Sequence, residues 1–217
     1  METILFRDIW LDDSEDALLA FIVGKSILDD DEDLNMIHRM AKDAMSIASP
    51  KAVCCIAEIT ARSSDWIEIE GIRITSPLVM HNLENTHRVF PYIATCGTEL
   101  EAWSHNFSDP LKQYWADQVK LFYLGKIRSY MSDQIRKRFF PVGHMSSMNP
   151  ISKNGLTQQA VLFRLSAMGG RHRRCLDRQF NVSSKSSSSF FSSKEAYENC
   201  QFCPILNCPG RRAPYKE

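Results

Sequence analysis

The chain has 217 residues, 44% of them hydrophobic, and its 26 basic residues balance its 26 acidic residues. This length suffices for one large domain or two small ones with a buried core. The balanced charge excludes a general attraction to nucleic acid or to an anionic membrane. The chain contains no apolar run of about 18 residues, so no membrane span is predicted. Residues 1–8 lack the pattern of a secretory signal. Seven cysteines without such a signal are typical of the reducing cytoplasm, where we expect the protein to be located.

The first fifty residues predict two helices after a short lead-in. Residues 4–11 are expected to form an edge strand or an irregular segment. Asp12, Asp13 and Ser14 are expected to open a short helix that runs through Val23, with acidic residues at its positive end. Apolar residues recur at three- and four-residue steps over residues 34–48, which is typical of an amphipathic helix. We therefore assign residues 1–50 to an N-terminal helical segment.

Beyond residue 50 the hydrophobic pattern changes to a period of two. Residues 53–59 alternate, and residues 66–75 alternate on both sides of a glycine, as in strands of an antiparallel sheet. Residues 89–95 predict a further strand. The neighbours Cys54 and Cys55 fall on opposite faces of their strand, so we expect them to be packing residues rather than joint metal ligands.

A turn follows the strand at residues 89–95. Gly97 is expected to reverse the chain, and Thr98 to cap a short helix. Cys96 then lies at a strand-to-helix turn. Backbone N–H groups at such a turn favour a thiolate, whereas most cysteines at such positions are packed and inert.

The longest predicted helix starts at Asp109 and Pro110, a cap followed by proline in the first turn, and runs to Arg138. Residues 136–138 are basic and complement the negative end of the helix, with no further basic run to indicate nucleic-acid binding. Residues 140–156 are rich in Gly, Ser, Pro and Asn and predict a long loop.

Two further elements are expected before the C-terminal tail. Thr157 can cap a helix that Gly169 and Gly170 end. The serine-rich stretch within residues 172–191 is flanked by apolar residues and predicts a returning hairpin that pairs with the central sheet.

The tail, residues 198–215, carries three cysteines at C-x2-C-x4-C spacing: Cys200, Cys203 and Cys208. Such spacing suits Zn²⁺ or an iron–sulfur cluster, both of which usually take four ligands. Cys96 is our candidate for the fourth. The alternatives are a disulfide with a spare thiol, or three unreacted thiols.

Four stretches of the chain together resemble one family. They are Asn82-Leu83-Glu84 with His87-Arg88-Val89-Phe90-Pro91-Tyr92, Ala94-Thr95-Cys96-Gly97 with Glu99-Leu100-Glu101, Ser146-Ser147-Met148-Asn149-Pro150, and Asn199-Cys200 with Cys203-Pro204 and Cys208-Pro209-Gly210-Arg211-Arg212-Ala213-Pro214-Tyr215. The chain resembles, over nearly its whole length, stand-alone proteins related to the activation domain of vitamin B12-dependent methionine synthase. The cysteine tail is a feature of the stand-alone branch and is absent from the methionine synthase domain.

The resemblance implies an α+β fold, a twisted antiparallel sheet with packed helices over residues 51–217, forming one structural unit with the N-terminal segment. It also implies docking on a cobalamin-carrying domain, where inactive cob(II)alamin is reduced by one electron and remethylated from S-adenosylmethionine. The family's Arg-x-x-x-Gly-Tyr-Pro loop aligns with His144 at the arginine and with Met148, Asn149 and Pro150 at the last three positions. The acidic residue that the family carries on the preceding long helix aligns near Gly125 or Ser129, neither of which is acidic.

The expected cofactor-binding residues are those four together with Arg211 and Arg212 of the tail. The predicted function is an accessory protein that docks on a corrinoid protein or cobalamin-dependent methyltransferase and supports reductive reactivation of its cobalt, with an electron donor protein as a further partner. The alternatives are an S-adenosylmethionine-binding methyl donor for cobalamin and a zinc-stapled binding module without a redox role. No catalytic residue is assigned, and neither nucleic acid nor membrane is an expected partner.

Overall fold

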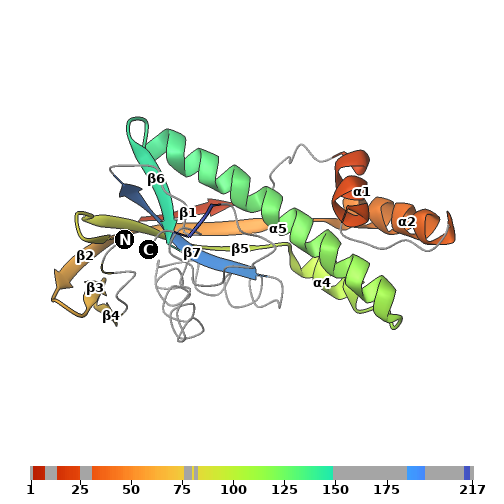
Figure 1. The fold of residues 1–217 in the computed structure, drawn as a ribbon, viewed down its shortest axis with the longest axis horizontal. Coiled ribbons are helices and arrows are strands. Elements are labelled where there is room, and N and C mark those ends of the chain that lie inside the picture. The colour runs from red at the N-terminus through yellow and green to blue at the C-terminus, as the bar shows by residue number, and fades with distance from the viewer. Residues whose placement is uncertain are drawn as a thin grey trace.

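The computed structural model of the protein describes residues 2–7, 14–24, 31–75, 80, 83–148, 185–193 and 213–215. It is an α+β structure in which helices pack on an antiparallel sheet, as expected from the sequence (Figure 1). In chain order the described elements are β1 (Glu2–Phe6), α1 (Glu15–Val23), α2 (Asp31–Ile47), β2 (Lys51–Arg62), β3 (Ile67–Ile69), β4 (Ile72–Ile74), β5 (Arg88–Thr95), α4 (Thr98–Ser104), α5 (Pro110–Phe139), β6 (His144–Met148) and β7 (Lys185–Ser193).

The sheet is organised around β2 and β5. Its strand order is β4-β3-β2-β5-β7-β6, and β1 pairs separately with β2. The first half of β2 lies between β1 and β5, and its second half turns, after an irregularity between Ile59 and Ala61, to pair with β3. Strand β7 enters between β5 and β6, with Phe190 opposite Phe90. The pairing of β7 with β5 confirms that this stretch joins the central sheet, whereas the hairpin predicted within residues 172–191 begins outside the described residues.

Helix α5 extends from the helices to the sheet (Figure 1) and contributes to two separate cores. Its first half packs with α1, α2 and α4, and its second half packs on the sheet. At about 100° per residue, the two buried sets point in directions roughly 120° apart. The first set is Trp115, Ala116, Val119, Phe122 and Tyr123, and the second is Leu124, Ile127, Met131 and Ile135. The long helix therefore joins the helical end of the molecule to the sheet.

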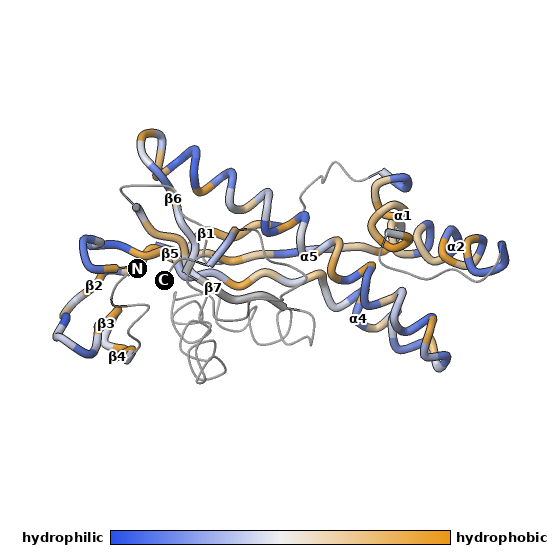
Figure 2. The backbone as a smooth tube through the Cα atoms, viewed as in Figure 1, coloured by the Kyte–Doolittle hydropathy of each residue, from blue (hydrophilic) through white to orange (hydrophobic). Residues whose placement is uncertain are grey.

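Each face of the sheet buries apolar side chains. Cys54 faces α5 together with Phe90 and Tyr92, whereas Val89 and Phe191 belong to a cluster on the other face, under the β3–β4 hairpin. Figure 2 shows hydrophobic residues concentrated along the central strands. Burial, and to a lesser extent the neighbouring Cys55, raises the pKa of the Cys54 thiol far above its usual value. Both thiols are buried, as expected for packing residues.

Two predicted helix starts are confirmed by their caps. Ser14 Oγ accepts from the Ala17 N–H at 3.1 Å. Asp109 Oδ1 accepts from the N–H groups of Leu111 and Lys112 at 2.9 and 3.0 Å. Because helix N-termini leave donors without intrahelical partners, these polar side chains define where α1 and α5 begin.

Three details differ from the expectations. Gly97, rather than Thr98, occupies the cap position of α4, and Thr98 is the first helical residue. Leu111, which the apolar spacing places on the buried side of α5, is 38% exposed. The stretch expected as a loop from residue 140 contains β6.

Several expectations concern residues outside those that the structure describes. These are the helix predicted from Thr157, the start of the serine-rich stretch, and most of the cysteine tail. The division at residue 50 stays a prediction, although β1 from the first segment pairs with β2, with Thr3 opposite Cys55. Within the described ranges, no helix combines the length and the apolar character that crossing a membrane requires.

Candidate functional site

The predicted cofactor-binding residues begin on β6, the outermost strand of the sheet path. His144 is the first residue of β6, lies opposite Ser193 and is exposed. The backbone of Met148, the last residue of β6, lies opposite Ser189. Asn149 and Pro150 lie outside the described residues. The first five positions of the aligned stretch, residues 144–148, therefore form β6 itself.

The neighbouring strand and the core hold β6 in place. The turn before it uses Gly143 with φ 93°, a conformation that suits glycine. Ser146 is buried, and its Oγ lies 2.8 Å from Ser193 Oγ on β7. Under these strands, the Phe190 and Tyr92 rings stack with centroids 4.7 Å apart. A ligand that contacts β6 would thus meet a strand held by its pairing with β7 and by the packing of Met145 on the core.

Cys96 lies at the other end of the sheet. The register places Thr95, at the end of β5, opposite Lys185, whereas His144 is opposite Ser193. Lys185 and Ser193, the two residues of β7 opposite them, are eight residues apart, which corresponds to about 26 Å along the strand. The structure therefore does not bring Cys96 together with His144.

The surroundings of Cys96 are apolar. The side chain is fully buried in the cluster shared by α1, α2, α4 and α5, and its Sγ lies 3.7 Å from the Gly97 carbonyl. The position at a strand-to-helix turn is as expected. A role as fourth metal ligand would require this buried thiol to be reached by the tail, and it stays a prediction.

The other predicted metal ligands, Cys200, Cys203 and Cys208, lie outside the described residues, as do Arg211 and Arg212. Among the residues that are described, no three His, Cys, Asp or Glu side chains gather in a way that could hold a metal ion. The three tail cysteines therefore stay predicted metal ligands, and the described residues provide no metal site of their own.

The turn that follows Cys96 is held by polar contacts. Gly97 has φ 102°, and its N–H donates to Thr95 Oγ1 at 3.2 Å. Glu99, in the first turn of α4, accepts from Lys51 Nζ at 3.1 Å. Burial alone would raise the pKa of the Glu99 carboxyl. Hydrogen bonds from its own backbone N–H and from Lys51, together with the positive charge of Lys51, outweigh this effect, so the pKa lies below its usual value. The turn is therefore tied to the start of β2.

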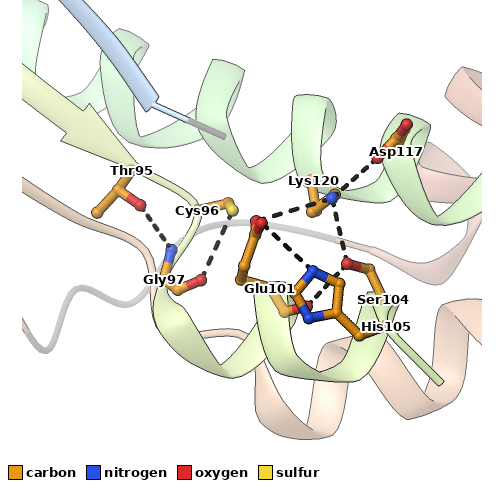
Figure 3. A network of polar contacts seen from close by, with 8 residues as sticks. All are labelled: Thr95, Cys96, Gly97, Glu101, Ser104, His105, Asp117 and Lys120. Carbon is orange, nitrogen blue, oxygen red and sulfur yellow. Dashed lines mark hydrogen bonds and ion pairs between the residues drawn. The ribbon is translucent and has the colours of Figure 1, made fainter. Parts of the chain in front are cut away.

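A charge network around the buried Lys120, between α4 and α5, was not predicted from the sequence (Figure 3). Lys120 is 7% exposed, and its Nζ lies 2.8 Å from Asp117 Oδ1, 3.1 Å from Ser104 Oγ and 3.7 Å from Glu101 Oε2. His105 Nε2 lies 3.8 Å from Glu101 Oε1. A buried ammonium is costly unless it is paired. A signal was present, since Lys120 follows the buried Val119 and lies one turn from the buried Ala116 and Tyr123.

The described elements define an α+β protein whose antiparallel sheet is crossed by one long helix that also carries a separate helical layer. Such a fold occurs in a solved structure, the crystal structure of the MetH reactivation domain bound to AdoHcy. The two chains match with a TM-score of 0.58 over 91% of this chain and 80% of that chain, at 12% sequence identity. No family model and no curated protein matches the chain. The comparison thus shows a shared fold.

Proposed function

We propose that this chain docks on a corrinoid-carrying protein and supports the reductive reactivation of its cobalt. The observation that carries the proposal is the fold shared with the MetH reactivation domain. The sequence motifs quoted above point in the same direction. Co-elution with a corrinoid protein in gel filtration is the expected result, and separate elution at micromolar concentrations would contradict docking.

The chemistry of reactivation requires an electron and a methyl group. One electron reduces cob(II)alamin to cob(I)alamin, whose cobalt then takes a methyl cation from a donor and becomes methylcob(III)alamin. Because cob(I)alamin is easily reoxidised, methyl transfer makes the return irreversible. An accessory protein can contribute by presenting the electron, by binding the methyl donor, or by both.

We assign the electron-carrying part to the tail cysteines. Three thiolates at this spacing suit an iron–sulfur cluster or zinc, and the described cysteines are buried and do not gather. We expect anaerobically purified protein to contain stoichiometric iron and sulfide. Zinc, which has no redox chemistry, would instead indicate the zinc-stapled module without an electron-carrying role. Replacing Cys200, Cys203 and Cys208 together by serine should remove the metal, whereas Cys54→Ala should not. Metal content that is negligible in the wild type, or unchanged in the triple variant, would contradict the assignment.

A second candidate function is binding of S-adenosylmethionine as the methyl donor, at the end of β6. The MetH reactivation domain was crystallised with AdoHcy, the compound that remains when S-adenosylmethionine has given up its methyl group. His144 opens β6 in an exposed position, where its ring is accessible to a ligand. This proposal places the adenosyl ligand against residues 144–150.

Calorimetric titration with AdoHcy checks the second candidate. We expect binding that His144→Ala weakens about tenfold, the loss of one hydrogen bond of roughly 1.4 kcal/mol. The matched control is His38→Ala, because His38 lies on α2 and contacts Glu15. Absence of heat at millimolar AdoHcy, or equal effects of the two substitutions, would count against a site on β6.

A further inference from the structure

A cavity of about 320 Å³ lies between the end of α4, the connection that follows it, and the first turns of α5. Its lining consists of Ser104, His105, Phe107, Gln113, Asp117 and Lys120. This volume is at the lower end of the range for small-molecule sites. The cavity is at the helical end of the molecule, whereas β6 lies at the other end of α5 (Figure 1).

Lys120 brings a fixed positive charge to this cavity. An ammonium group has three N–H donors. Two of them are used by Asp117 Oδ1 at 2.8 Å and Ser104 Oγ at 3.1 Å. Glu101 Oε2, at 3.7 Å, is beyond the length of a direct hydrogen bond. Figure 3 shows Lys120 reaching from α5 toward these groups. The ammonium therefore retains capacity for one more acceptor.

The same lining offers acceptors. Asp117 is 63% exposed, and a carboxylate has lone pairs beyond the one that Lys120 uses. Gln113 Nε2 donates to the Phe107 carbonyl at 2.8 Å. That bond orients the amide of Gln113 and leaves its oxygen as an acceptor. A ligand thus meets one fixed donor and two acceptors at neighbouring positions along α5.

The charges around the cavity select among ligand classes. Lys120 contributes one positive charge, and Asp117 and Glu101 contribute two negative charges. A phosphate or carboxylate ligand would face both carboxylates. A second ammonium could pair with Asp117 but could not accept from Lys120. A hydroxyl group both accepts and donates, and two adjacent hydroxyls match Lys120 and Asp117 together. Carboxylates bind ribose hydroxyls in this way in other proteins.

We propose that this cavity binds the vicinal diol of a sugar ring, either of a free sugar or of the ribose of a nucleoside. Asp117 and Gln113 accept from the hydroxyls, Lys120 donates to one of them, and the Phe107 side chain packs against the apolar part of the ligand. This site is separate from β6 and does not depend on the function proposed above.

Titrations followed by amide chemical shifts test the site with three probes: D-ribose, adenosine and 2′-deoxyadenosine. We expect ribose or adenosine to shift the amides of residues 104–120, and 2′-deoxyadenosine to bind at least tenfold more weakly than adenosine. Binding by ribose and adenosine, or by either alone, supports the proposal. Binding by ribose alone indicates a free sugar, binding by adenosine alone indicates a nucleoside, and binding by both indicates that the diol itself is recognised.

Variants locate the binding. Asp117→Asn should weaken it at least tenfold. The matched control is Asp133→Asn, since Asp133 pairs with Arg136 at 2.6 Å with the same spacing on the same helix, away from the cavity. Gln113→Leu serves as a second variant if thermal melts show that Asp117→Asn is unfolded. Shifts confined to β6, equal binding of 2′-deoxyadenosine, equal effects of the two Asp variants, or no shift at millimolar ligand would overturn the proposal.

Discussion

Replacing Gly97 by alanine is expected to lower the free energy of unfolding by about 3 kcal/mol or more. Gly97 combines φ 102° with ψ 152°, a region that is essentially restricted to glycine. An added Cβ would also lie 2.6 Å from the backbone oxygen of Ser49 and 2.8 Å from Glu99 Oε2. The Glu99 side chain can move, but the Ser49 backbone cannot move without shifting the start of β2.

Two other glycines separate the causes of that effect. Gly71 has φ 77° but open space around its Cβ position, so Gly71→Ala should cost only about 1–2 kcal/mol of backbone strain. Gly125 lies within α5, also with open space, and Gly125→Ala should stabilise by about 0.5–1 kcal/mol. Urea unfolding of the three variants measures how their free energies of unfolding rank. Equal costs for Gly97→Ala and Gly71→Ala would show that the contact with Ser49 does not matter.

Replacing Lys120 by methionine is expected to lower the free energy of unfolding by about 2–3 kcal/mol. Removing one partner of a buried ion pair costs roughly 3–5 kcal/mol, and the exposed Asp117 reduces this figure because water screens it. The main penalty is the negative charge of Glu101, whose side chain is only 15% exposed. Methionine retains most of the side-chain volume, so loss of packing contributes little.

Lys126→Met is the matched control for that substitution. Lys126 lies on the same helix, and its Nζ is 5.2 Å from the centre of the Phe122 ring. A cation–π contact of this kind is worth about 0.5–1 kcal/mol. Denaturant midpoints, compared at constant m-value, give the change in the free energy of unfolding for each of the two substitutions. If the two substitutions cost the same, the network in Figure 3 does not stabilise the protein.

Much of the fold could be predicted because local signals agree with it. Ser14 and Asp109 cap helices where their side chains allow it, alternation marks the start of β2, and a short apolar run marks β5. β6 was missed because its sequence, His144 to Met148, contains two serines and follows a glycine turn, so it has no apolar alternation. Only its pairing with β7, more than forty residues later, makes it a strand.

The site was less predictable than the fold. Sequence spacing placed Cys96 correctly at a turn but could not indicate that it would lie about 26 Å along the sheet from the level of His144. The partners of Lys120 come from two helices, and only Asp117 is near it in sequence. Contacts between elements are decided by how α5 divides its surface between two cores, which no local pattern encodes.

The central proposal, reactivation of a corrinoid partner, is tested most directly by the absorption spectrum of the cobalt. A corrinoid protein in the cob(II)alamin state is mixed anaerobically with an electron donor and S-adenosylmethionine, with and without this chain, and with the variant that lacks the three tail cysteines. We predict that the wild-type chain accelerates conversion to methylcobalamin at least tenfold and that the tail variant does not. Conversion at the same rate in all three mixtures would contradict the account.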